Sequence, residues 1–269
     1  SVSAPAALLV PGATASQEPP VEQTPAATLP RVLPGPVDIV WADPRNLMFR
    51  AGPTEDERML SPQAFNSNII VTYGPGFAAV PQAQAAFQAA VDIWRSVITS
   101  PVTIRVNADY KDLLNPNVLG FAGPGNICSS SVSGANTYYA AALWDKLIGT
   151  GAHCSSSFEI NANFNSTFPN WDFGTSGVPV GGTYNFLTVV LHELGHGLGH
   201  YGSMTVSGGM GSYRFVPDIY VRFAVTGAGA PLLGFVSPSA APAAQLVSGG
   251  TFFNGPYARP QNGSANANL

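Results

Sequence analysis

The sequence is organised around one stretch, His192-Glu193-Leu194-Gly195-His196-Gly197-Leu198-Gly199-His200. It holds three of the four histidines in a chain of 269 residues. Its first five residues fit the pattern H-E-x-x-H, in which two histidines on one helix face bind a metal ion and the glutamate acts as a base. A chance scatter of histidines does not explain this clustering, so the stretch predicts a metal site.

Residues 183–198 are predicted to form the helix that carries this pattern. At ~100° per residue, His192 and His196 lie about 40° apart, whereas the apolar side chains point roughly 160–260° away from His192. These apolar residues are Leu187, Val190, Leu191, Leu194 and Leu198. The apolar stripe can therefore pack on a sheet while both imidazoles face a cleft. The alternative is that the histidines cap or line a core and bind no metal.

Hydrolysis is the chemistry that this pattern predicts. Two imidazole nitrogens suit Zn²⁺ at ~2.0–2.1 Å, and zinc lowers the pKa of its bound water toward ~7. Glu193 directly follows His192 and is placed to take a proton from that water as it attacks a polarised carbonyl. The predicted cofactor is therefore Zn²⁺, with His192 and His196 as ligands and Glu193 as the catalytic residue.

Residues 189–199 resemble the active-site helix of the zincin metallopeptidases, and Gly199 is similar to the final glycine of the metzincin pattern H-E-x-x-H-x-x-G. The resemblance covers residues 65–200. It implies a zincin-like α+β fold, with a mixed twisted sheet, a long backing helix and an active-site helix, followed by an irregular Gly/Pro-rich C-terminal lobe. It also implies that an edge strand, here residues 158–164, lines the cleft and pairs with extended substrate.

The third zinc ligand departs from the family pattern. Metzincins usually place a histidine three residues after the glycine, but that position is Gly202 here, and His200 directly follows Gly199. On a continuous helix His200 would lie ~12 Å along the axis from His192. His200 therefore becomes a candidate ligand only if Gly199, or earlier Gly197, ends the helix with a positive φ and turns the chain back.

Two alternatives to His200 remain open. Asp218 is the only carboxylate residue after Glu193, and it would match the aspartate-liganded zincins, although their companion motif is missing. A leishmanolysin-type arrangement, with a long insertion before the third histidine, would place the ligand beyond Leu269.

Metzincins also have a methionine turn beneath the metal, and Met210, between Gly209 and Gly211, resembles it loosely. The alternative reading of Met210 is a gap-filling side chain in a loop. Tyr201, Tyr213 and Tyr220 are candidates to hydrogen-bond a developing oxyanion, and the sequence does not choose among them.

Upstream of the histidines, the pattern predicts a strand, a helix and a second strand. Residues 69–73 form a β-branched run, and a helix is expected from Pro81 to about residue 98, with an apolar stripe at Phe87, Val91, Trp94 and Ile98. Apolar residues then alternate over residues 102–106, and this order implies a parallel crossover. A first strand at residues 37–41 and a short helix near residues 138–147 are also expected.

Composition restricts the partners. The net charge of -4 comes with scattered Lys and Arg, so no basic patch favours nucleic acid. The longest apolar runs are far shorter than the ~20 residues that cross a bilayer, so no membrane span is expected. The predicted partner is a protein or peptide substrate, and a monomer is favoured.

Cys128 and Cys154 are the only cysteines and lie in a region rich in Ser, Gly and Asn. They predict one disulfide formed in an oxidising compartment, which would stabilise the fold by ~3–4 kcal/mol; two free thiols are the alternative. Residues 6–15 resemble the end of a secretory signal. A secreted, extracellular location is therefore expected.

Three regions are predicted along the chain. Residues 1–36 contain eight prolines and are expected to be a disordered leader or linker. Residues 37–200 would form the N-terminal zincin-like lobe. Residues 201–269 would form an irregular, β-containing C-terminal lobe, and whether this lobe is truncated is left open. In that lobe, residues 219–223, 232–233 and 251–253 are strand candidates.

The leading hypothesis is a secreted zinc metalloendopeptidase, a hydrolase that cleaves peptide bonds. The alternative is a secreted binding or surface module that keeps the zincin scaffold with weak or absent catalysis, which the irregular third ligand favours. A structural zinc site is the third reading.

Overall fold

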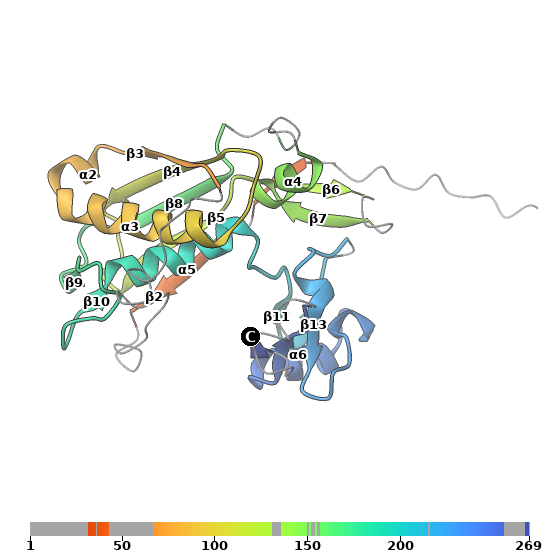
Figure 1. Ribbon diagram of the computed structural model, residues 1–269. Coiled ribbons are helices and arrows are strands. Elements are labelled where there is room, and N and C mark those ends of the chain that lie inside the picture. The colour runs from red at the N-terminus through yellow and green to blue at the C-terminus, as the bar shows by residue number, and fades with distance from the viewer. Residues whose placement is uncertain are drawn as a thin grey trace, which may run out of the picture.

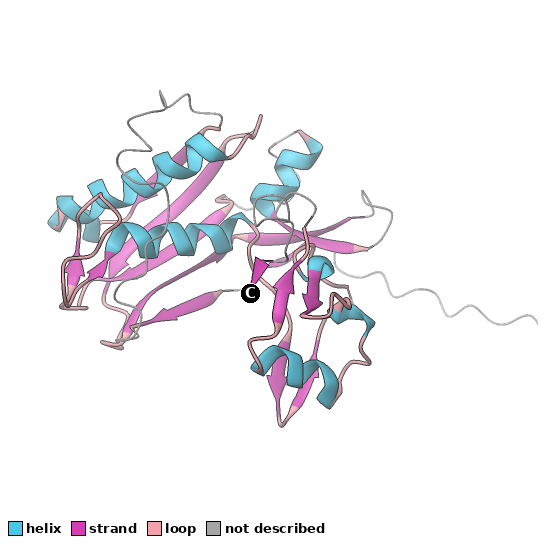
Figure 2. Cartoon of the chain, turned by 60° about the horizontal axis from the view of Figure 1, so that its bottom comes forward, coloured by secondary structure: helices cyan, strands magenta, loops and turns pink. Residues whose placement is uncertain are grey.

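The computed structural model describes residues 32–35, 37–42, 67–130, 136–149, 151, 154, 157–214, 216–255 and 267–268. Within these residues the chain has the expected α+β character, with helices and strands of a mixed sheet alternating along it (Figures 1 and 2). No helix in the described part of the chain is both long and apolar enough to cross a membrane.

The predicted strand, helix and strand are present. β3 (Ile69–Tyr73) is followed by the short helix α2 (Gly76–Ala79) and by α3 (Pro81–Val97). Pro81 begins α3 because a first-turn residue needs no N–H donor. β4 (Ile104–Lys111) then pairs with β3 in parallel, which confirms the predicted crossover.

The main sheet has five strands in the order β2-β5-β8-β4-β3. β8 (Ile160–Asn165) is parallel to β4 and antiparallel to β5 (Val118–Pro124), and β2 (Asp38–Trp41) is antiparallel to β5. The prediction that residues 158–164 form an edge strand is therefore wrong, because this strand lies in the middle of the sheet. A period-two pattern shows which side chains face inward but not which strands are neighbours.

Two helices cover one face of this sheet. α3 and α5 (Phe186–Leu198) lie side by side across it (Figure 1). The indole N–H of Trp94 on α3 donates a hydrogen bond to the carbonyl oxygen of Leu191 on α5, at 3.1 Å. Alternate side chains of β4, such as Val106 and Ala108, are fully buried in the core beneath the helices.

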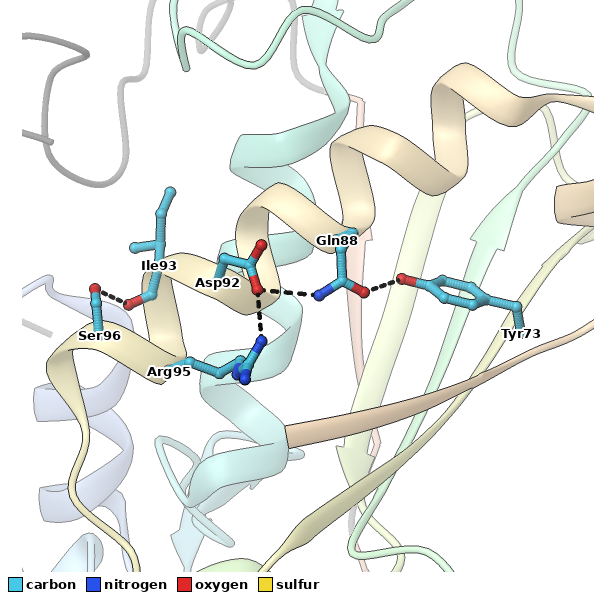
Figure 3. Close-up of polar contacts among 6 residues, drawn as sticks. All are labelled: Tyr73, Gln88, Asp92, Ile93, Arg95 and Ser96. Atoms are coloured by element: carbon cyan, nitrogen blue, oxygen red, sulfur yellow. Dashed lines mark hydrogen bonds and ion pairs between the residues drawn. The ribbon is translucent and has the colours of Figure 1, made fainter. Parts of the chain in front are cut away.

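The outer side of α3 has a short polar network (Figure 3). The Tyr73 hydroxyl donates to Gln88 Oε1 at 3.0 Å, and the Gln88 amide donates to Asp92 Oδ1 at 3.1 Å. Arg95 binds the same carboxylate oxygen at 3.1 Å. Burial, with a smaller effect of the Asp92 charge, raises the pKa of Tyr73, so this hydroxyl stays protonated and remains a donor. The network joins β3 to α3 while Phe87 faces the core.

A second sheet has three strands in the order β1-β6-β7. Its strands are β1 (Val32–Pro34), β6 (Asn126–Ser130) and β7 (Thr137–Ala140), with α4 (Ala141–Ile148) after them. The helix expected near residues 138–147 thus begins later, because residues 137–140 pair with β6. Cys128 and Cys154 form the predicted disulfide, with their Cα atoms 5.7 Å apart.

The described residues after α5, called the C-terminal lobe below, form short elements (Figure 2). Residues 251–253 form the predicted strand, but the strands expected at 219–223 and 232–233 are wrong, because both segments contain 3₁₀ turns. The elements are β11 (Thr205–Ser207), β12 (Met210–Ser212), η2 (Val221–Phe223), β13 (Ala224–Thr226), η3 (Leu232–Gly234), α6 (Ala240–Val247), β14 (Thr251–Phe253) and β15 (Ala267–Asn268).

The N-terminal segment is partly built into the fold. β1 pairs with β6 and β2 with β5, so the predicted leader boundary at residue 36 lies between two paired segments. Residues 1–31, which make up most of the predicted leader, lie outside the described residues.

Candidate metal centre

The start of α5 is fixed by a side-chain cap. β9 (Trp171–Asp172) and β10 (Tyr184–Asn185) form a short parallel pair that leads into the helix. The side-chain oxygen of Asn185 accepts a hydrogen bond from the backbone N–H of Thr188 at 3.0 Å, as an N-cap residue does. The helix therefore begins at Phe186, three residues later than the predicted start.

The faces of α5 differ sharply in exposure. The apolar residues Leu187, Val190 and Leu194 are buried, as the helical phase predicted, whereas His192 is exposed and His196 partly exposed. Gly197 lies so close to β8 that a Cβ atom there would overlap the side chain of Ile160. The helix is thus pressed onto the sheet with its histidine face outward.

The two histidines point toward each other. Their Nε2 atoms are 2.9 Å apart, and their ring centroids 4.6 Å. Two nitrogens bound to one zinc ion at ~2.0–2.1 Å in tetrahedral geometry would be about 3.3 Å apart, so a small opening of the pair would accommodate the ion. The structure therefore brings together the two ligands that the sequence predicted.

The backbone after the helix orients His196. Its Nδ1 donates a hydrogen bond to the carbonyl oxygen of His200 at 2.6 Å. In the neutral ring Nε2 is then unprotonated, so it is the acceptor in the 2.9 Å contact with His192 Nε2 and the nitrogen that would bind a metal. Metal-binding histidines commonly use their other N–H in this way, which fixes the tautomer and the orientation of the ring.

The end of α5 explains how the His200 carbonyl reaches this position. Gly199 has a φ of 119°, in the left-handed region that favours glycine. The N–H groups of Gly199 and His200 donate to the carbonyl oxygens of His196 and Gly195, at 3.1 and 3.0 Å. This Schellman-type end turns the chain at the residue where the sequence allowed a turn.

Glu193 is fully buried, with 0% of its surface exposed. It is one of the largest completely buried side chains of the chain, next to the exposed His192. A carboxylate is costly to remove from water, and an adjacent dication would offset that cost. Glu193 is therefore buried while its neighbour His192 is exposed, and its role as the base stays a prediction.

His200 faces aromatic rings. Its ring centroid lies 6.4 Å from that of Trp94 and 5.8 Å from that of Tyr220. Desolvation lowers the pKa of the His200 imidazole, and the charge of His196 lowers it further, so the neutral form is favoured. His200 thus contributes its backbone carbonyl to the His196 ring, while its side chain is exposed at the surface and contacts the rings of Trp94 and Tyr220.

Asp218, the alternative third ligand, is 1% exposed and lies in a polar cluster with Ser203 and Arg214. Burial raises the pKa of its carboxyl group, while hydrogen bonding by Ser203 and the charge of Arg214 lower it by less. The backbone around it pairs with Tyr138, whose N–H donates to Pro217 at 3.0 Å. Asp218 therefore anchors the C-terminal lobe to β7.

A complete ligand set does not gather at one point. Among the residues that the structure describes, no three His, Cys, Asp or Glu side chains are grouped so that they could hold a metal ion. The structure thus brings the His192 and His196 side chains together, while their role as metal ligands and the identity of a third ligand stay predictions.

The remaining candidates lie in different places. Met210 is 43% exposed on β12, so a role beneath the metal stays a prediction without support from its position. Tyr213 donates its hydroxyl hydrogen to the carbonyl oxygen of Phe235 at 2.9 Å. Tyr201 is buried beside Asp218, and burial raises its pKa. Tyr220 is the candidate tyrosine that contacts a histidine of the motif.

Some contributors to the site were missed from the sequence. Trp94, expected only as a core residue, binds the α5 backbone and contacts the His200 ring. The Asn185 cap had a readable signal, since Asn directly precedes an apolar helical run. The carbonyl of His200 had none, because a backbone acceptor leaves no trace in side-chain patterns.

Comparison with known proteins adds no relative. No protein-family model, no curated protein and no solved structure matches this chain.

Proposed function

We propose that this chain is a secreted zinc-dependent endopeptidase of zincin type. The observation that carries the proposal is the facing pair of Nε2 atoms, 2.9 Å apart, with the His196 ring fixed by the His200 carbonyl. Two imidazole nitrogens this close together on the solvent-facing side of α5 support a role in binding a metal ion. The disulfide and the lack of a membrane-crossing helix in the described residues are compatible with secretion.

The residues divide the chemistry among them. His192 and His196 would hold zinc through Nε2. Zinc, when bound, supplies Lewis-acid polarisation of a carbonyl and lowers the pKa of water. Glu193 would accept a proton from the attacking water and return it to the leaving amine. In this role its carboxylate, which is completely buried, would have to come within hydrogen-bond reach of the attacking water.

The decisive experiment compares Glu193→Gln with His192→Ala. Glu193→Gln keeps shape and volume, so we expect it to retain zinc while cleavage of casein falls by ~10²–10⁴-fold, the usual contribution of a general base. His192→Ala should lose both zinc and activity. Full activity in a zinc-loaded Glu193→Gln protein would defeat the proposal.

The third ligand is tested separately, by zinc content in His200→Ala and Asp218→Asn proteins. His200→Ala keeps the backbone carbonyl that orients His196, so zinc loss in this variant would identify the imidazole as the ligand. Zinc loss in Asp218→Asn would identify the carboxylate. Retention in both would exclude these two side chains as the third ligand.

A second candidate function is a secreted binding module with weak or absent catalysis. It is favoured by the observation that the described residues group only two ligands of the predicted set. This reading predicts protein that lacks stoichiometric zinc and leaves both casein and gelatin uncleaved.

A further inference from the structure

The indole of Trp94 on α3 touches α5 and the turn after it at three points. Its N–H donates to the carbonyl oxygen of Leu191 at 3.1 Å. At Gly195 the atom nearest to an added Cβ would be Cζ2 of this indole, at 3.6 Å, so the ring lies against the helix backbone there. Its ring also meets that of His200 edge-on, with the two centroids 6.4 Å apart.

These contacts lie beside the two histidines of the helix. Leu191 and Gly195 directly precede His192 and His196 in the chain. The third contact reaches His200, whose carbonyl oxygen accepts the Nδ1 hydrogen of His196 at 2.6 Å. A shift of the turn by about 1 Å would stretch this bond to roughly 3.6 Å, at which it no longer counts as a hydrogen bond. The orientation of the His196 ring therefore depends on where the turn after α5 is held.

The indole is carried by a helix that is itself firmly packed. Phe87 and Val91, on the preceding turns of α3, are fully buried in the core. α3 and α5 lie side by side over the same face of the sheet (Figure 1). The Leu191 carbonyl can accept the indole N–H in addition to the helical bond from the N–H four residues later, because a carbonyl oxygen has two lone pairs.

We propose that Trp94 is a positioning residue for the histidine pair. It fixes the part of α5 that carries His192 and His196, and it keeps the His200 carbonyl within reach of the His196 ring. The effect of Trp94 on zinc binding rests on the proposed function. Its effect on the His196 ring does not, because the bond to the His200 carbonyl is present without a metal.

Two substitutions of Trp94 and one matched control test the proposal. Trp94→Phe keeps an aromatic ring but removes the N–H donor, and Trp94→Leu removes both. Trp171→Phe is the control, because the Trp171 indole also donates to a backbone carbonyl, that of Asn165 at 2.8 Å. Its ring also contacts α5, but at Phe186, the first residue of the helix, with the centroids 4.9 Å apart.

Three quantities are measured on each full-length protein. They are the free energy of unfolding in urea, the tautomer of the His196 ring in metal-free protein, and the dissociation constant of zinc by competition with a chelator. The tautomer is read from the ¹⁵N shifts of the ring at about pH 8, where a free histidine is neutral.

We expect Trp94→Phe and Trp171→Phe to lose similar stability, because each loses one indole hydrogen bond. The wild type and the Trp171→Phe control should hold the His196 proton on Nδ1, since a carbonyl oxygen can only accept. Both Trp94 variants should populate the other tautomer as well. Their zinc affinity should fall by ~10–100-fold, as it does when an outer-shell partner is lost, with the larger loss in Trp94→Leu.

The outcomes separate this proposal from the proposed function. An unchanged His196 tautomer in both Trp94 variants would overturn it, and so would an equal tautomer change in the Trp171→Phe control. A changed tautomer with unchanged zinc affinity would overturn the part that concerns the metal. A wild type that binds no zinc would defeat the proposed function, and the tautomer alone would then decide whether Trp94 positions the ring.

Discussion

At the scale of single residues, His200 divides its contribution between backbone and side chain. Its carbonyl oxygen accepts the Nδ1 hydrogen of His196, while its ring contacts the rings of Trp94 and Tyr220. Only the backbone half depends on the turn at Gly199. The position after the helix therefore orients a ligand whether or not its own imidazole binds zinc.

Asp218 gives a pH-dependent prediction at this scale. Burial raises the pKa of its carboxyl group above the ~3.9 of an unfolded chain. At a pH between the unfolded and the folded pKa, the folded state therefore binds more protons than the unfolded state does. The stability from the protonated form is present below that unfolded value and is lost as pH rises through the folded pKa. Asp218→Asn has no such loss. Its free energy of unfolding, measured by urea denaturation, should therefore rise relative to that of the wild type as pH increases from 4 to 7.

Asp112→Asn is the control for this series. Asp112 is exposed, and its variant shows what the same substitution does at the surface over the same pH range. An Asp218→Asn protein that lost stability against the wild type as pH rose would contradict the argument and point to a charged role for this carboxylate.

At the scale of elements, the contact between α5 and β8 predicts opposite effects for two neighbouring glycines. A Cβ atom at Gly197 would overlap Ile160, so Gly197→Ala should cost ~1–3 kcal/mol through overpacking. At Gly195 the nearest atom to a new Cβ is on Trp94, at an ordinary 3.6 Å. Gly195→Ala should therefore stabilise by ~0.5–1 kcal/mol, because alanine favours a helix interior.

Urea denaturation of the two variants checks this pair. Shortening the side chain in a Gly197→Ala and Ile160→Val double variant should recover part of the loss. Equal effects of the two alanine substitutions would mean that α5 does not sit as close to β8 as the structure has it.

The helix end gives a second matched pair. Gly199 and Gly149 both end helices with positive φ, at 119° and 75°, so an alanine at either should cost ~1–2 kcal/mol of strain. Only Gly199 carries the His200 carbonyl toward His196. Gly199→Ala should therefore also weaken zinc binding by ~10–100-fold, as loss of an outer-shell partner does, while Gly149→Ala keeps wild-type affinity. A competition titration with a chromophoric chelator measures both.

The same elements show what the sequence could predict. The parallel β3–α3–β4 unit and the exposed histidine face of α5 followed from apolar spacing, because spacing determines which side of an element is buried. The central place of β8 did not follow, because strand order depends on long-range pairing. β1 was missed because three residues that include Pro34 give no period, and its pairing depends on β6.

At the scale of the whole molecule, N-terminal strands complete the two larger units of sheet, because β1 pairs with β6 and β2 pairs with β5. The C-terminal lobe is anchored through the backbone pairing of Tyr138 with Asp218. The short elements of that lobe have little periodicity, which is why 3₁₀ turns were mistaken for strands there. The predicted two metal ligands lie on one helix, whereas a third would have to come from a neighbouring segment. The sequence motif specifies the two predicted histidine ligands, whereas the position of a third ligand depends on how the rest of the chain folds around them.

The disulfide allows the stability of the fold to be changed without changing the residues of the predicted zinc site. Cys128 lies on β6 and Cys154 follows 26 residues later, so the bond closes the segment that contains β7 and α4. Replacing both residues by serine should reduce the free energy of unfolding by ~3–4 kcal/mol, mainly by freeing the unfolded chain. Zinc affinity should stay unchanged, because His192, His196 and the Gly199 turn lie outside the closed segment. Urea denaturation and zinc titration of the double variant measure both, and the wild type under reductant should match it. A loss of zinc binding in parallel with stability would show instead that the small sheet is needed to hold the end of α5 in place.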